Sequence, residues 1–142
     1  MRQPLLLSAL FAGAAVLNGC FGALKDAQDQ ALKLETAMRR QMANGDVAGI
    51  YNNDDQSYHD AATREKSDAL FNAIAQKLGT PLTCGQGGIN VTVNTSGTFI
   101  RSECATPFSK NAKATETFVW KKSGNEFKLA GYHINSDELI TR

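Results

Sequence analysis

The first half of the chain carries apolar residues at the spacing of a helix. Between residues 24 and 43 they recur every three or four positions, at Leu24, Ala27, Ala31, Leu34, Met38 and Met42. This spacing predicts an amphipathic helix over 24–43, and Gly45 is expected to end it. Asp46 follows and is placed to cap a short second helix that contains Ile50 and Tyr51.

A third helix is expected over about residues 62–78. Its apolar face consists of Leu70, Phe71, Ile74 and Leu78. Asp60 or Thr63 is placed to cap its start. Gly79 and Pro81 then end it, because neither residue continues a helix well.

From residue 89 the apolar period changes to two, which is the alternation of a half-buried strand. Four segments show it: 89–93, 98–108, 114–122 and 126–135. NTSG at 94–97 and KSGN at 122–125 supply hairpin turns. We therefore expect an α+β fold, with N-terminal helices packed on one face of a four-stranded antiparallel meander. The other face is expected to stay partly open or to meet a partner.

The N-terminus has the order of an export signal. Arg2 is followed by an uncharged apolar run from Leu5 to Leu17, as in secreted precursors. Residues 17–20, Leu-Asn-Gly-Cys, resemble the lipobox of bacterial lipoproteins, although Ala, Ser or Thr is usual where this chain has Asn18. The resemblance implies that the chain is cut before Cys20 and that Cys20 is acylated, which anchors the protein in a membrane.

This interpretation divides the chain into a signal peptide (1–19), a lipidated tether (20–26) and a single α+β domain (27–142). Phe21 follows the Cys where an Asp would favour the inner membrane, so the resemblance favours the outer membrane, facing the periplasm. Two alternatives stay open. One is an ordinary cleaved signal with an incidental Cys. The other is an uncleaved anchor helix over the roughly twenty positions that precede the first charge after Arg2.

The charge balance limits the partners. Removing residues 1–19 leaves 123 residues, with 14 Lys and Arg against 14 Asp and Glu. A net charge of zero argues against a nucleic-acid-binding protein, which would need a basic face. There is also no polybasic patch for anionic lipids. The expected partners are the membrane, through the N-terminal lipid, and an envelope protein or a small ligand.

The cysteine count predicts a disulfide. If Cys20 is acylated, Cys84 and Cys104 remain, and an even remainder in an exported protein indicates a bridge. Two free thiols would fit only a reducing compartment, and a metal site would need two further ligands nearby. In a bulge-free ladder around the 94–97 turn, Cys84 would lie opposite residue 107. A bulge or loop at the glycines of 85–88 is therefore expected.

Two stretches carry a resemblance to a known superfamily. ANGDVAGIY at 43–51 is similar to the opening of nuclear-transport-factor-2-like (cystatin-like) domains, where GD separates the first two helices. ETFVWKKSGNEFKLAGYHI at 116–134 is similar to the last two strands of secreted bacterial members of unknown function. The resemblance covers residues 27–135 and implies a curved sheet around a long helix, often with a cone-shaped pocket. It carries no catalytic residue across.

A few side chains could line that pocket. Tyr132 and His133 alternate on the last strand, so one of them should face the helices, and Tyr51 lies on the second helix. His59 stands among carboxylates in DDQSYHDAAT, but the calcium-loop pattern fails there and a capped polar loop is the favoured interpretation. CGQGG at 84–88 lacks the Lys-Ser/Thr of a phosphate loop, and the cystatin Gln-x-Val-x-Gly motif is absent.

No nucleophile or metal motif stands out, and no cofactor is expected. The sequence therefore favours a membrane-tethered, non-enzymatic binding or interaction module of the cell envelope. A small-ligand carrier or pocket enzyme, which would use the cavity between sheet and helices, is the alternative. A filled core and an exposed apolar sheet face would favour the module, and an enclosed apolar cavity with an inward His would favour the alternative.

Overall fold

The computed structural model describes residues 18–140; residues 1–17 and 141–142 lie outside it, and with them most of the predicted signal peptide. The helices are α1 (Asn18–Ala43), α2 (Val47–Asn52), α3 (Gln56–Ala61), α4 (Arg64–Lys77) and α5 (Asp137–Ile140). The strands are β1 (Gly85–Asn94), β2 (Gly97–Pro107), β3 (Lys113–Ser123) and β4 (Glu126–Asn135).

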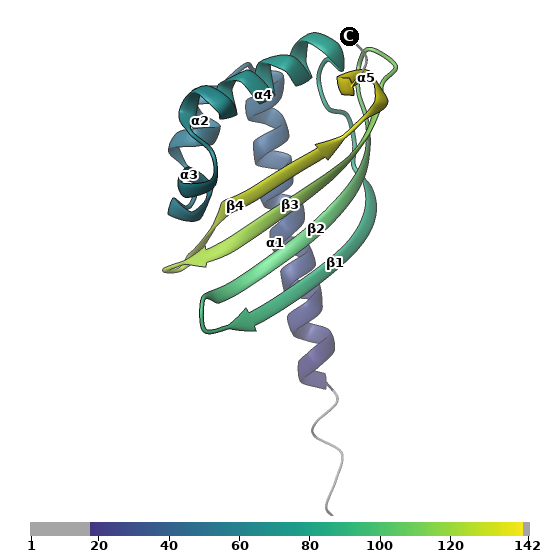
Figure 1. The fold of residues 1–142 in the computed structure, drawn as a ribbon. Helices are drawn as coiled ribbons and strands as arrows, with labels where there is room; N and C mark the ends of the chain where they lie inside the picture. The colour runs from purple at the N-terminus through teal and green to yellow at the C-terminus, as the bar shows by residue number, and fades with distance from the viewer. Residues whose placement is uncertain (1–17, 141–142) are drawn as a thin grey trace, which may run out of the picture.

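The four strands form one antiparallel meander in the order β1-β2-β3-β4. α1 crosses one face of the sheet, α2, α3 and α4 lie beside the β4 edge, and the second face carries no helix in the described part of the chain (Figure 1). The predicted α+β architecture, with helices before a four-stranded meander, is confirmed.

α1 is longer than its apolar stripe predicts. It begins at Asn18, so residues 20–26, expected as a tether, are helical. With 26 residues it is about 39 Å long, at 1.5 Å per residue. Ala27, Ala31 and Met38 are buried against the sheet, whereas Leu32 on the flank stays 47% exposed. The apolar stripe therefore packs on the sheet from Ala27 onward.

Side-chain caps begin the next three helices. Asp46 accepts a hydrogen bond from the Gly49 N–H at the start of α2, as predicted. Thr63, rather than Asp60, caps α4. The short helix α3 was not predicted, because a single turn gives no apolar repeat; Asp55 caps it by accepting the Ser57 N–H.

A bulge in β1 sets the position of the disulfide. Ile89 pairs with Ser102, but Gln86 pairs with Cys104, so Gly87 and Gly88 oppose one residue of β2. A Cβ at Gly87 would lie 2.7 Å from the Glu103 carbonyl oxygen, which explains why glycine stands there. The bulge shifts the register by one of the three positions, and Cys84 lies just before β1, outside the ladder. From there Cys84 forms a disulfide with Cys104, with a Cα–Cα distance of 5.4 Å.

A second bulge corrects the expected alternation on the last strand. Val119 pairs with Gly131 while Trp120 pairs with Leu129, which leaves Ala130 as the extra residue. Strict alternation would have put Leu129 and His133 on the same face. Instead, Leu129 is buried, Tyr132 joins the core side, and the His133 side chain is exposed.

The core lies between α1, α4 and the inner face of the sheet. Its least exposed large side chains are Phe108, Phe118, Ile74, Leu78 and Ile100. Phe118 and Trp120 stack with ring centroids 5.8 Å apart, and Tyr132 contacts Phe118 at 5.3 Å. These aromatic rings occupy the space in which the family resemblance implied a pocket.

Candidate functional site

Charged side chains are buried where α1 crosses the sheet. Glu116 on β3 is fully inaccessible, and Nη1 of Arg39 lies 2.8 Å from its Oε2. The Tyr132 hydroxyl donates a 2.7 Å hydrogen bond to Oε1 of Glu116, and the Thr106 hydroxyl donates to Oε2. Burial, together with the Glu116 charge, raises the pKa of Tyr132 well above its usual value, so it stays a neutral donor. Both carboxylate oxygens are thus satisfied within the protein.

Glu35 lies one helical turn before Arg39 and faces β2. It is 4% exposed, accepts a hydrogen bond from the Ser102 hydroxyl, and its Oε2 lies 3.2 Å from Cys104 Sγ. Burial raises the pKa of Glu35, while the Ser102 hydrogen bond and the Arg39 charge oppose this rise. A carboxyl group that resists ionisation therefore adjoins the disulfide.

A pocket of about 220 Å³ opens between α1, the end of α2 and the start of β4. Its walls are mainly apolar: Leu34, Ala37, Met38, Ile50, Phe127 and Leu129. Side chains with polar groups also line it: Gln41, Asn53, Asp54, Trp120 and Lys128. Two of these are buried, Asp54 at 8% exposure and Trp120 at 4%. Asp54 Oδ2 and Trp120 Nε1 have no hydrogen-bond partner among the described residues. Buried polar atoms are almost always paired, so two unpaired ones at one pocket indicate a missing partner.

The protonation state of Asp54 decides whether its carboxyl group can donate a hydrogen bond. Burial raises the pKa of Asp54 to about 8, so at neutral pH the carboxyl group is mostly protonated. It can then donate one hydrogen bond and accept others, and the Trp120 indole N–H donates only. The pocket therefore combines mainly apolar walls with a few polar groups, of which Asp54 Oδ2 and Trp120 Nε1 are buried and unpaired, which is a usual composition of a small-molecule site.

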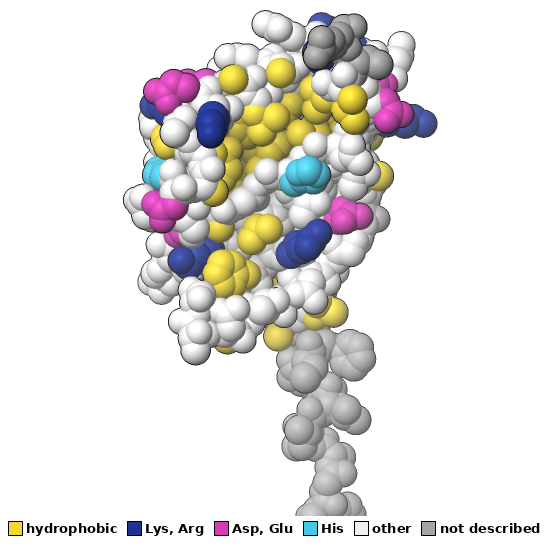
Figure 2. All heavy atoms as spheres, in the orientation of Figure 1, with side chains coloured by type: hydrophobic (Ala, Val, Ile, Leu, Met, Phe, Trp, Pro, Cys, Tyr) yellow, Lys and Arg dark blue, Asp and Glu magenta, His cyan; other side chains and the backbone are white. Residues whose placement is uncertain are grey.

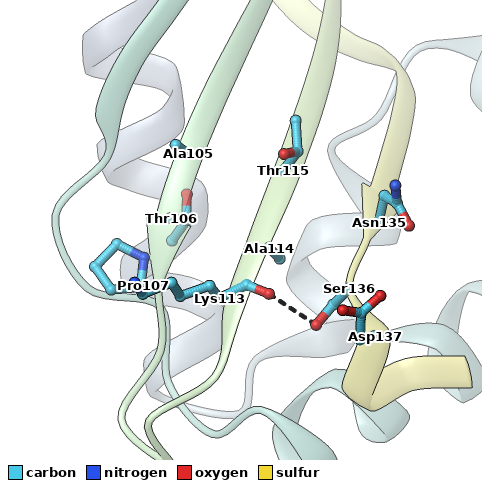
Figure 3. A pocket seen from close by; sticks show the side chains of 9 residues that line it. All are labelled: Ala105, Thr106, Pro107, Lys113, Ala114, Thr115, Asn135, Ser136 and Asp137. Carbon is cyan, nitrogen blue, oxygen red and sulfur yellow. Dashed lines mark hydrogen bonds between the residues drawn. The ribbon is translucent and has the colours of Figure 1, made fainter. Parts of the chain in front are cut away.

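Two other grooves are less suited to binding chemistry. Figure 2 shows an apolar hollow between α4 and β4, a groove of about 290 Å³. Its polar groups include Tyr58 and Ser67, whose hydroxyls already bond one another at 3.2 Å. The second groove, about 460 Å³, lies where β2 and β4 end and β3 begins (Figure 3). There the Ser136 hydroxyl donates a 2.8 Å hydrogen bond to the Lys113 carbonyl oxygen.

The residues predicted to line the pocket lie in three different environments. Tyr132 points into the core and bonds Glu116. His133 is exposed, on the face of the sheet that carries no helix. Tyr51 is half-buried and stacks on His59, with ring centroids 4.3 Å apart.

The polar stretch around His59 forms local structure. The His59 Nε2 lies 2.7 Å from the Tyr51 carbonyl oxygen, and Asp60 accepts a hydrogen bond from Gln56 within α3. Asp55 caps α3 and lies 3.7 Å from the Lys121 ammonium group. Only Asp54 in this stretch lines the 220 Å³ pocket.

One trio has ligand atoms close enough for a metal ion. Glu35, Cys84 and Cys104 place one ligand atom each within 4.8 Å of the others. The two sulfur atoms are joined in the disulfide, however, and a disulfide lacks the thiolate that binds a metal.

Across residues 18–140, no helix has the length and apolar character needed to cross a membrane.

No family model, no curated protein and no solved structure matches this chain.

Sequence reasoning missed the pocket and the buried charges. Glu116 did carry a signal, because it stands at an inward position of an alternating strand between Ala114 and Phe118. Glu35 also follows Ala31 by four positions on the stripe of α1. Asp54 gave no signal, since an Asp pair in a polar stretch is most often a solvated turn.

Proposed function

We propose that this chain is a lipid-anchored protein of the bacterial cell envelope, with a nuclear-transport-factor-2-like (cystatin-like) domain that binds a small ligand without catalysis. The observation that carries the binding function is the pocket in which Asp54 Oδ2 and Trp120 Nε1 are both buried and unpaired. Its mainly apolar walls and these two buried polar groups suit a ligand with an apolar body and one hydroxyl or carbonyl oxygen.

The arrangement supports binding more than catalysis. The space between α1 and the sheet is filled by Arg39, Glu116 and aromatic rings, and His133 is exposed instead of facing inward. Lys128 and Asp54 both line the pocket, but an Asp54 carboxyl group that is mostly protonated at neutral pH is poorly suited to act as a base for a nucleophile. A carrier or sensor therefore has more support than a pocket enzyme.

The anchor rests on the lipobox-like residues 17–20. α1 includes Cys20, and from Gly22 onward, where side-chain burial is described, its first buried residue is Ala27. If Cys20 is acylated, only about two helical turns separate the lipid from the packed domain, which then stands close to the bilayer. Cys20→Ser is expected to abolish acyl labelling and to leave an unprocessed precursor. Efficient cleavage of that variant at the same site would contradict acylation.

The single tryptophan of the chain makes ligand binding measurable. Trp120 lines the pocket, so its fluorescence reports directly on occupancy. We expect 1-octanol, an apolar chain with one hydroxyl, to give a saturable change in Trp fluorescence. Affinity should fall above about pH 8, where Asp54 ionises and loses its donor.

Asp54→Leu tests the role of the buried carboxyl group. Loss of one buried hydrogen bond corresponds to roughly a tenfold weaker affinity for octanol. Asp29→Leu on the exposed surface of α1 is the matched control and should bind as the parent does. A linear, non-saturating fluorescence change, or equal affinity of the Asp54→Leu variant and the parent, would reject the ligand site.

A further inference from the structure

The two cysteines of the disulfide differ in exposure. Cys104 is 2% exposed, whereas Cys84 is partly exposed and lines a groove of about 370 Å³ between α1 and the Pro81–Cys84 segment. The space beside Cys104 measures only about 10 Å³, at the lower limit for a single water molecule. Through these two spaces, an incoming thiol can reach Cys84 but not Cys104.

The groove beside Cys84 suits a thiol carried on an apolar group. Leu32 and Leu82 line it at 47% and 50% exposure, so an apolar ligand would cover surface that now faces water. Glu35 and Arg39 also line it. A cysteine side chain within an apolar peptide segment fits this combination.

Glu35 lies beside the sulfur that would leave. Its Oε2 is 3.2 Å from Cys104 Sγ, and a disulfide sulfur carries no hydrogen. A hydrogen bond across this contact must therefore be donated by a protonated Glu35. Burial raises the pKa of Glu35 and so favours the protonated carboxyl group. The hydrogen bond from the Ser102 hydroxyl and the Arg39 charge lower the pKa, whereas the Glu116 charge raises it.

We infer that Cys84–Cys104 is a thiol–disulfide exchange site for protein thiols, in which Cys84 receives the thiol and Glu35 protonates Cys104. A substrate thiolate attacks Cys84 Sγ and forms a mixed disulfide. The Cys84–Cys104 bond breaks, its electron pair goes to Cys104 Sγ, and that sulfur takes the Glu35 proton. A second substrate thiol then displaces Cys84, so two thiols are oxidised to one disulfide while the protein disulfide is reduced.

Mapping of the mixed disulfide tests the direction of attack. The full chain carrying Cys20→Ser, in mild detergent, is mixed with reduced glutathione at neutral pH, quenched with acid and analysed by mass spectrometry. Glutathione is expected on Cys84. Glutathione on Cys104, or a disulfide that reacts only after unfolding in urea, would overturn the proposal.

A rate measurement tests the acid. Glu35→Gln keeps the shape of the side chain but has no proton to transfer, so reduction by glutathione at neutral pH should slow at least tenfold. Glu126→Gln in the exposed β3–β4 hairpin is the matched control and should react at the parent rate. The urea midpoint of the oxidised protein checks that each variant is folded. A Glu35→Gln rate within about twofold of the parent would overturn the role of Glu35. If that variant does not fold, the mapping on the parent chain decides alone.

Discussion

Arg39 on α1 and Glu116 on β3 form an ion pair across the interface between helix and sheet, with Nη1 2.8 Å from Oε2. The Glu116 side chain is fully inaccessible and that of Arg39 is 11% exposed. The guanidinium group also lies over the Phe118 ring, 5.6 Å from its centroid. The pair therefore fixes the position of the long helix over the centre of the sheet, in a place where most domains would use apolar packing.

Loss of one partner should cost more than loss of both. Glu116→Leu leaves the Arg39 charge without its carboxylate and should lower the free energy of unfolding by about 3 kcal/mol or more. The double variant Arg39→Met/Glu116→Leu replaces both charges by apolar groups and should be more stable than Glu116→Leu alone. Urea unfolding of the two single variants and the double variant measures the coupling. Strictly additive losses would contradict a direct interaction.

The Tyr132 hydroxyl should contribute measurably to stability. Tyr132→Phe removes a 2.7 Å hydrogen bond to a buried carboxylate, a class of bond that contributes about 1.5–3 kcal/mol. The control is Tyr51→Phe, which loses only a 3.4 Å contact with the Ala62 carbonyl oxygen and should cost less than about 1 kcal/mol. Equal losses in the free energy of unfolding for the two variants, measured with urea, would show that the hydrogen bond to Glu116 contributes no more to stability than the Tyr51 contact.

The helices and strands could be predicted from local sequence patterns, whereas the candidate site could not. Apolar periodicity located α1, α4 and the four strands, because each buries one continuous face. An irregularity near Gly87 was foreseeable, since the Cys84–Cys104 bridge needed either a bulge or a position of Cys84 before the ladder, and the structure has both. The bulge at Ala130 was not, because nothing in KLAGYHI marks an extra residue; it follows from the pairing with β3, where Val119 is opposite Gly131 and Trp120 is opposite Leu129.

The Asp54–Trp120 pocket depends on three elements meeting at long range. Neither residue has a local partner that would reveal it: Asp54 follows α2, and Trp120 lies 66 positions later on β3. Their proximity results from the register of the meander and from α2 docking beside it. Hydrophobic periodicity contains no information of that kind, which is why the sequence pointed instead to Tyr51, Tyr132 and His133.

Loss of the disulfide should destabilise the domain without changing its fold. Cys84 and Cys104 are 20 positions apart, and closing a loop of this length stabilises by about 3 kcal/mol on the chain-entropy model. Cys84→Ala/Cys104→Ala in the Cys20→Ser background should shift urea unfolding by that amount. A thiol titration of the Cys20→Ser protein, denatured without reductant, should find no reactive thiol. Two thiols per chain would contradict the bridge.

Neighbouring Asp54 and Asp55 should respond to pH in opposite directions. Burial raises the pKa of Asp54 to about 8 in the folded protein, against about 4 in the unfolded chain. The unfolded chain therefore releases the Asp54 proton first, and the contribution of this group to stability is lost as pH rises from about 4 to about 8. Burial also acts to raise the pKa of Asp55, but hydrogen bonds from Ser57 and the Lys121 charge outweigh it and the pKa is lowered. The contribution of Asp55 is therefore present above about pH 4 and lost below it.

Two isosteric variants separate these effects. Asp54→Asn cannot ionise, so it should be more stable than the parent near pH 8 and should show a smaller decline in the free energy of unfolding between about pH 5 and 8. Asp55→Asn should be less stable than the parent at pH 7, because it weakens the α3 cap and removes the charge that faces Lys121. Urea unfolding at several pH values across this range measures both. A parallel pH dependence for Asp54→Asn and the parent would show that the Asp54 carboxyl group ionises normally in the folded protein, and would remove the protonated donor on which octanol binding depends.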